Sequence, residues 1–155
     1  MTTPAPFDEP QHRHQASQTP AYSFGATVPL PFDEAVAHLT EALKAEGFGV
    51  LTTIDVKETM KARLNIDFER YSILGACNPH LAHRALELEH TVGLLLPCNI
   101  VVHEAHDAQG AARTHIDVAD PVAMLGIVQN PPMQEVAKEA RDRLERVIAT
   151  LTTAT

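Results

Sequence analysis

The stretch that most constrains the fold is Tyr71–Leu86, YSILGACNPHLAHRAL, in which a short apolar run ends in Cys-Asn-Pro and a helical pattern follows. An asparagine before a helix can accept a hydrogen bond from the first turn, and proline suits the first helical position. We therefore predict a strand over Tyr71–Cys77 and a helix over Pro79–Glu89. A second Cys-Asn pair, Cys98 and Asn99, lies in the apolar run LLLPCNIV further along the chain.

The rest of the chain alternates between strand and helix patterns. Alternating or β-branched apolar runs predict strands, whereas apolar residues three or four positions apart predict helices. Further strands are expected at Tyr22–Val28, Phe48–Asp55, Val92–His103 and Arg113–Asp120, and further helices from Phe32 to just before Gly47, over Val56–Leu64 and from Met133 to Leu151. This order, β-α-β-α-β-α-β-β-α, predicts an α+β protein with a mixed β-sheet and helices packed on it. Pro97 is expected to place its strand at a sheet edge or a bulge.

A single α+β domain is expected over residues 22–155, because a chain of 155 residues can bury a substantial core without disulfides or metals. Residues 1–21 differ in composition, since they contain four prolines and almost no periodic apolar residues. Such a segment buries too little apolar surface to offset the entropy of ordering it. We therefore expect residues 1–21 to form a disordered tail.

Charge narrows the choice of partners. The formal net charge is −8 and the pI is near 5.5. Phosphate backbones are bound by clustered Lys and Arg, so neither nucleic acid nor an anionic membrane is expected as a partner. The sequence shows no targeting signal and no apolar run of membrane-spanning length. We therefore expect a cytoplasmic protein whose two cysteines are free thiols.

The two cysteines are the first candidates for chemistry. Cys77 ends a predicted strand directly before a helix N-terminus, where unpaired backbone N–H groups create partial positive charge. Such a position suits a reactive or metal-binding thiol, although a free cysteine is also a common small side chain in a core. The proline before Cys98 is expected to make the backbone irregular and approachable by a ligand. If the strands on either side of the helix pair in a right-handed crossover, both thiols lie at one end of the sheet.

Histidines supply further candidate ligands. His80, His83 and Glu87 share the face of the predicted helix that points away from its apolar side. This pattern is typical of a solvated face, and the alternative is a metal or cofactor site completed by a second chain. The candidate metal ligands are Cys77, His80, His83 and Cys98, and the candidate cofactor-binding residues are Cys77, Asn78, Cys98 and Asn99. His103 and His115 lie on the two arms of a predicted hairpin and are expected to face each other as a surface pair.

A family resemblance is carried by three strings, GFGVLTTIDVKETM, LGACNPHLAHRAL and LLPCNIVV. They are similar to the domain-of-unknown-function family 302, whose pattern has the form GACNP…A…AL followed by LLPCN. The similarity spans Phe24 to Leu151. It implies a compact α+β protein with a mixed sheet that is commonly a homodimer. The motif is matched by Cys77, Asn78, Pro79, Cys98 and Asn99, and the resemblance brings no catalytic assignment with it.

Three functions remain open. The favoured one is a dimeric binding module in which Cys77 and Cys98, with a nearby histidine, hold a metal ion, a haem or a small thiol-reactive ligand, because thiolate and imidazole together suit zinc, copper or haem iron. The second is a thiol-dependent enzyme with Cys77 as its nucleophile. The third is a structural or regulatory interaction domain without chemistry. The sequence contains none of the glycine-rich or nucleophile-elbow motifs of common enzyme classes.

Overall fold

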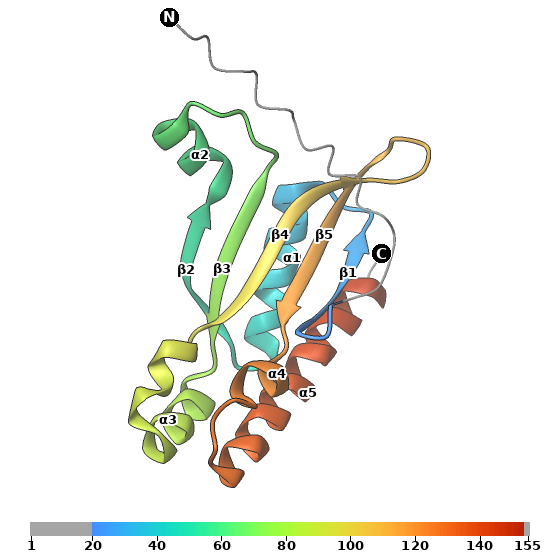
Figure 1. Cartoon of the computed structure of the whole chain (residues 1–155). Coiled ribbons are helices and arrows are strands. Elements are labelled where there is room, and N and C mark those ends of the chain that lie inside the picture. Colours follow the sequence, from blue (N-terminus) through green and yellow to red (C-terminus); the bar gives the residue numbers. More distant parts are fainter. Residues whose placement is uncertain (1–19, 154–155) are drawn as a thin grey trace, which may run out of the picture.

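The computed structural model describes residues 20–153, and Figure 1 shows how their helices and strands are arranged. The elements in chain order are β1 (Ser23–Val28), α1 (Phe32–Ala45), β2 (Gly49–Asp55), α2 (Val56–Leu64), β3 (Tyr71–Cys77), α3 (Pro79–Leu88), the short 3-10 helix η1 (His90–Leu95), β4 (Cys98–His106), β5 (Ala112–Ala119), α4 (Pro121–Leu125) and α5 (Pro131–Thr153). The α+β class and the predicted order are confirmed, with η1 and α4 as short additions. The predicted tail lies, except for its last two residues, outside the described part of the chain. Within residues 20–153, no helix is both long and apolar enough to cross a membrane.

The strands form one sheet of five in the order β1-β5-β4-β3-β2. The element order predicts a sheet with strands of mixed direction, but every neighbouring pair in the described sheet is antiparallel. The connection between β3 and β4 explains the difference. Its two helices, α3 and η1, both lie beyond the same end of the sheet (Figure 1). The chain therefore re-enters beside β3 in the opposite direction, without the crossover that a parallel pair requires.

The predicted strand Val92–His103 is wrong in its first half. Residues His90–Leu95 form η1, and β4 begins only at Cys98. Val92 is buried in an apolar cluster with residues of α3 and α5 instead of in the sheet. A short apolar run does not by itself distinguish a strand from a buried helical turn. Pro97 therefore precedes β4, which lies in the middle of the sheet and not at an edge.

The predicted cap at the start of α3 is confirmed. Asn78 Oδ1 accepts a hydrogen bond from the backbone N–H of Leu81 at 3.2 Å, and Pro79 occupies the first turn. The side-chain amide of Asn78 also donates to the carbonyl oxygen of Glu46 at 3.4 Å. Asn78 is buried, so these two bonds satisfy a polar group that would otherwise be costly to desolvate. They join the end of β3 to the loop after α1.

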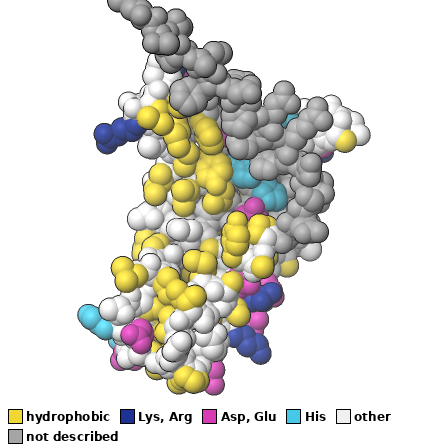
Figure 2. Space-filling model, viewed as in Figure 1, with side chains coloured by type: hydrophobic (Ala, Val, Ile, Leu, Met, Phe, Trp, Pro, Cys, Tyr) yellow, Lys and Arg dark blue, Asp and Glu magenta, His cyan; other side chains and the backbone are white. Residues whose placement is uncertain are grey.

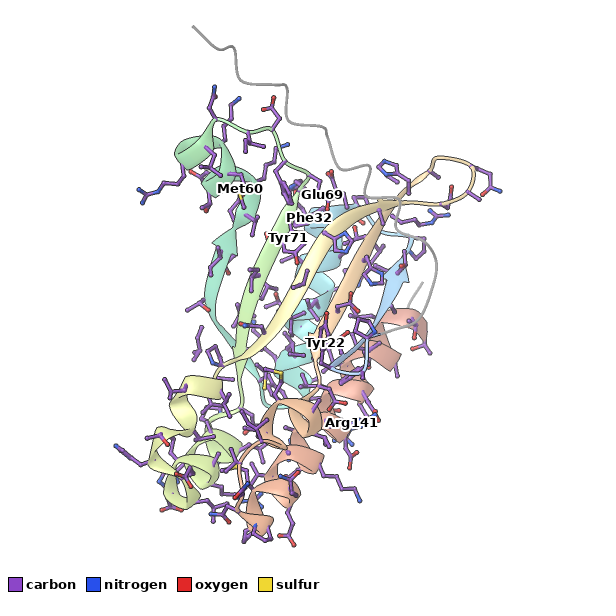
Figure 3. All side chains as sticks on the ribbon, viewed as in Figure 1. Tyr22, Phe32, Met60, Glu69, Tyr71 and Arg141 are labelled. Atoms are coloured by element: carbon purple, nitrogen blue, oxygen red, sulfur yellow. The ribbon has the colours of Figure 1, made fainter. Side chains whose placement is uncertain are left out.

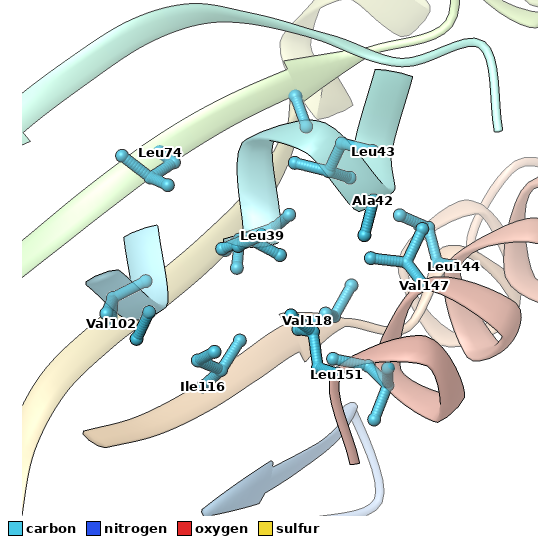
Figure 4. Close-up of a cluster of buried hydrophobic side chains, with 14 of the residues drawn as sticks. Leu39, Ala42, Leu43, Leu74, Val102, Ile116, Val118, Leu144, Val147 and Leu151 are labelled. Atoms are coloured by element: carbon cyan, nitrogen blue, oxygen red, sulfur yellow. The ribbon is translucent and has the colours of Figure 1, made fainter. Parts of the chain in front are cut away.

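Helices α1 and α5 cover one face of the sheet, and the main apolar core lies between these helices and the strands (Figure 4). Side chains from both layers interdigitate there with almost no exposed surface, among them Leu39, Leu43, Val102, Ile116, Leu144 and Val147. Burying a side chain of this kind stabilises the fold by about 1.5–3 kcal/mol relative to leaving it exposed. The core therefore holds the sheet and the two helices in one fixed arrangement.

None of the described helices covers the opposite face of the sheet, which is turned toward the viewer in Figure 1. Figure 2 shows apolar side chains gathered along this face and histidines beside them. Successive residues of a strand point to opposite faces. The residues that alternate with the core positions of β1, β3, β4 and β5 therefore point to this open face.

Candidate functional site

The open face carries a cluster of two histidines and one carboxylate at the centre of the sheet. His103 of β4 lies opposite His115 of β5 in the antiparallel register. Asp117 lies two residues further along β5 and so points to the same face. One metal-binding atom from each of these side chains lies within 4.8 Å of the others. Within residues 20–153, this is the one group of three such side chains that meets this spacing.

Hydrogen bonds hold both imidazole rings of the cluster. His115 Nε2 lies 2.8 Å from Asp117 Oδ2, and His115 Nδ1 lies 2.6 Å from the hydroxyl oxygen of Thr27 on β1. His103 Nδ1 lies 3.0 Å from the backbone carbonyl oxygen of Glu104. Thr27 is the direct cross-strand neighbour of His115. Three adjacent strands of the sheet therefore contribute to the cluster.

The partners of the rings indicate which nitrogen carries a proton. The carbonyl of Glu104 only accepts a hydrogen bond, so Nδ1 of His103 is the donor and the lone pair of the neutral ring lies on Nε2. The carboxylate of Asp117 likewise accepts, so Nε2 of His115 donates to it, and the Thr27 hydroxyl donates to Nδ1 of the neutral ring. The Thr27 hydroxyl can also accept, which lets His115 exchange its tautomer without losing this partner.

A hollow of about 400 Å³ lies beside the cluster and is lined by both His103 and Asp117. The ring of Tyr71 stacks on the ring of His103, with centroids 5.6 Å apart and planes 11° apart. Burial raises the pKa of the Tyr71 phenol, and the negative charge of Asp117 adds to the rise. Other lining residues include Tyr22, Phe68 and Glu69, and Figure 3 labels Tyr22, Glu69 and Tyr71 on this face.

The three side chains of the cluster differ in their access to solvent. His103 is only 7 % exposed, whereas the side chains of His115 and Asp117 are 29 % and 32 % exposed. The imidazole of His103 is therefore the most deeply buried group of the cluster, and the side chains of His115 and Asp117 lie nearer the surface. His103 and Asp117 both line the hollow, so a small ligand held there would lie against the cluster.

The structure brings Cys77 and Cys98 to the same end of the sheet. Cys98 pairs with Ala76, the residue before Cys77, and both free thiols line an apolar hollow of about 30 Å³. Burial raises the pKa of both thiols, and that of Cys98 reaches about 11 with the nearby Cys77 as a further cause. This shift is opposite to the lowered pKa of an activated nucleophile. A hollow of this size has room for a single small occupant and not for a haem.

The other residues singled out from the sequence lie elsewhere. His80 and His83 are exposed on α3 and do not line the hollow between the thiols. His83 Nε2 lies 3.5 Å from Glu87 Oε1, as in a solvated helix face. Asn78 serves as the helix cap, and Asn99 is exposed beside the hollow on the open face. A single site made of both thiols and both α3 histidines stays a prediction.

Sequence reasoning missed the central cluster as a group of three side chains. It correctly placed His103 and His115 opposite each other across the β4–β5 hairpin. It took them for a surface pair, whereas His103 is buried. The signal that it overlooked is the spacing of His115 and Asp117, because polar residues two apart in a strand share a face. Thr27 was not accessible to such reasoning, since only the pairing of β1 with β5 brings it to His115.

The fold and the cluster together define a class: an antiparallel α+β domain with helices on one face and two histidines and a carboxylate on the other. The chain belongs to the family described as domain of unknown function DUF302, whose model matches residues 24–151. A solved structure of an uncharacterized conserved DUF302 protein from Bacillus stearothermophilus is 30 % identical, with a TM-score of 0.75, and the match covers 85 % of this chain and 99 % of that one. No curated protein matches the chain at a significant level.

Proposed function

We propose that this protein binds a divalent transition-metal ion through His103, His115 and Asp117. The observation that carries the proposal is the convergence of two imidazoles and one carboxylate within 4.8 Å of one another. Two histidines and one carboxylate are a ligand set that zinc and ferrous iron sites share, and such sites keep coordination positions open for a further ligand. The function inferred is therefore that of a metal-dependent binding module.

The surroundings of the imidazoles support this assignment. Metal-binding histidines usually direct their second ring nitrogen at a carbonyl, carboxylate or similar partner, which orients the ring. The Nδ1 atoms of His103 and His115 have such partners in the carbonyl of Glu104 and the hydroxyl of Thr27. Nε2 is then the ligand atom of both rings. In the other tautomer of His115, with its proton moved from Nε2 to Nδ1, Nδ1–H would donate to the Thr27 hydroxyl and Nε2 would be left, with Asp117, to hold the metal ion.

The hollow beside the cluster indicates the kind of ligand that an open coordination position would receive. Its volume of about 400 Å³ lies within the range of small-molecule sites. Aromatic rings from Tyr71 and Phe68 line it together with the acidic Glu69. We infer a small ligand that has an apolar or aromatic part, because Tyr71 and Phe68 contribute aromatic rings to the lining.

Metal titration of the full chain tests the proposal. We expect Zn²⁺ or Co²⁺ to bind and raise the melting temperature, as any ligand selective for the folded state does. Asp117→Asn and His115→Gln should weaken binding at least tenfold, whereas His83→Gln, which removes an exposed imidazole on α3, should leave it unchanged. Equal binding by the wild type and both cluster variants would contradict the proposal. It would favour the interaction domain without chemistry that the sequence leaves open.

The proposal includes a homodimer, in agreement with the resemblance to the family. Strand β2 lies at an edge of the described sheet and exposes Leu51 and Ile54 by 68 % and 48 %. Leu64 and Ile66 add exposed apolar surface next to it. Edge strands with exposed apolar side chains are templates for pairing with another chain. We infer that two copies associate through β2 and α2.

Light scattering of the purified chain measures its mass in solution. A dimer is expected for the wild type, and Ile54→Lys should shift the mass toward the monomer because it buries a charge in the proposed contact. Leu94→Lys is the matched control, since Leu94 is 88 % exposed on η1 and away from β2. A monomeric wild type would refute this part. The cytoplasmic location and the lack of nucleic-acid partners remain inferences from the net charge and the sequence.

A further inference from the structure

We propose that Cys77 and Cys98 form a second metal site, distinct from the histidine cluster, that takes a soft monovalent cation such as Cu⁺ or Ag⁺. The two thiols lie on neighbouring strands at the end of the sheet, next to α3. This inference does not rest on the metal proposed for the histidine cluster.

The strand register places the thiols diagonally across the β3–β4 pair. Cys98 is the partner of Ala76, and Cys77 is the next residue along β3. Successive residues within a strand point to opposite faces of the sheet, but Cys77 is the last residue of β3 and lies near enough to Cys98 to raise the pKa of that thiol. Both thiols line one hollow of about 30 Å³, which has room for one small occupant. Cys77 and Cys98 therefore share a cavity of the size of a single ion.

The other walls of this hollow select against hard cations. Apart from the thiols, the lining side chains are apolar except for one, and include Phe48, Leu81, Leu96, Leu125 and Val136. The exception is Asn78, whose amide already bonds to the N–H of Leu81 and the carbonyl of Glu46. Magnesium, calcium and zinc need four or more oxygen, nitrogen or sulfur ligands. Soft thiolates select Cu⁺, and two of them can complete a linear site for a monovalent cation.

Binding of the cation by the two thiols conserves atoms and charge. Two S–H groups each lose a proton to the solvent, two sulfur–metal bonds form, and the product carries one net negative charge. Nothing is oxidised or reduced. The site lies beside the N-terminus of α3, a helix of ten residues, where partial positive charge from the backbone N–H groups favours an anion. Burial keeps the pKa of both free thiols raised, so the metal-free site holds two neutral S–H groups.

The structure narrows the ligand set expected from the sequence. His80 and His83 belong to the exposed side of α3 and are absent from the lining of the thiol hollow. A two-coordinate cation needs neither of them. The inferred site therefore consists of the two thiols alone, with α3 as electrostatic support.

Anaerobic titration of the reduced chain with Cu⁺, in competition with a colorimetric Cu⁺ chelator, tests the inference. The wild type is expected to withhold about one Cu⁺ per chain from the chelator, as two thiolates on one ion require. Cys77→Ser and Cys98→Ser should each abolish this uptake, because a single thiol cannot compete. His83→Gln should bind like the wild type. Full uptake by either cysteine variant would overturn the inference.

A second measurement guards against variants that fail to fold. Wild-type chain is treated with increasing Ag⁺ and then alkylated in denaturant, and mass spectrometry counts the blocked thiols. One shared site predicts that about one Ag⁺ per chain protects both cysteines together. Independent protection of each thiol by its own Ag⁺ would overturn the inference. Asp117→Asn should change neither the Cu⁺ uptake nor the protection by Ag⁺. The thiol site can therefore be tested independently of the histidine site.

Discussion

His103 and His115 face each other across the β4–β5 hairpin with their ring centroids 5.2 Å apart and their planes at 51°. One imidazole is almost fully buried and the other is partly exposed. Each ring has a hydrogen-bond partner at Nδ1. The backbone pairing and these partners fix the orientation of both rings, and this pre-organisation is the physical basis of the proposed metal site.

The hydroxyl of Thr27 should be measurable as an orienting group. Thr27→Val keeps the shape of the side chain and removes the partner of His115 Nδ1. We expect metal affinity to fall by about 10–100-fold, which is the usual effect of losing such a partner. A competition titration with a Zn²⁺ indicator measures the change. Thr53→Val, on the edge strand β2, is the matched control, and an equal affinity of Thr27→Val and the wild type would show that the hydroxyl does not orient the ring.

The cap of α3 should contribute measurably to stability. Asn78→Ala removes the acceptor for the N–H of Leu81 and the donor to the carbonyl of Glu46. We expect the free energy of unfolding in urea to fall by about 1–2 kcal/mol. Asn78→Ser retains a neutral capping oxygen and loses the amide donor, so its stability should lie between those of the wild type and Asn78→Ala. A loss in Asn78→Ser as large as in Asn78→Ala would show that the capping oxygen contributes little.

Gly75 should tolerate no side chain. A Cβ built at this position meets the hydroxyl of Thr52 and lies 2.7 Å from Cγ of Pro97. Gly75→Ala is expected to destabilise the fold by about 1–3 kcal/mol, the usual cost of overpacking. Gly49→Ala is the matched control, because a Cβ there meets no atom within 4 Å. Urea unfolding of both variants measures the contrast, and similar stabilities would show that Pro97 and Thr52 yield at little cost.

The buried thiol of Cys98 should make stability depend on pH in the alkaline range. Its pKa rises from the ordinary value of 9.0 to about 11 in the folded chain, mainly through burial. The stabilising contribution of the neutral thiol is therefore complete below pH 9 and is lost as the pH rises toward 11. Two pK units correspond to about 2–3 kcal/mol. Other groups titrate in the same pH range, so the wild type is compared with Cys98→Ala. The measurement is the difference between their free energies of unfolding at each pH. A difference that does not change with pH would contradict the prediction.

Local patterns were enough to predict most of the elements of this fold. The Cys-Asn-Pro sequence ends β3 and begins α3 because the cap and the proline act on their immediate neighbours. The apolar stripe of α5 is likewise visible in the chain, since its buried residues recur with the helical period. The run from Val92 was misread because apolar side chains serve a buried 3-10 turn as well as a strand.

The sequence by itself determined the α+β class, the order of the elements, the capped helix after Cys77 and the closeness of His103 to His115. Only the tertiary structure decided that β4 lies at the centre of the sheet, that β1 adds Thr27 beside His115, and that the two thiols share one hollow. The physical reason is the range of the interactions. Caps and helical stripes depend on residues three or four apart, whereas strand neighbours far apart in the chain are selected by the packing of the whole sheet against α1 and α5.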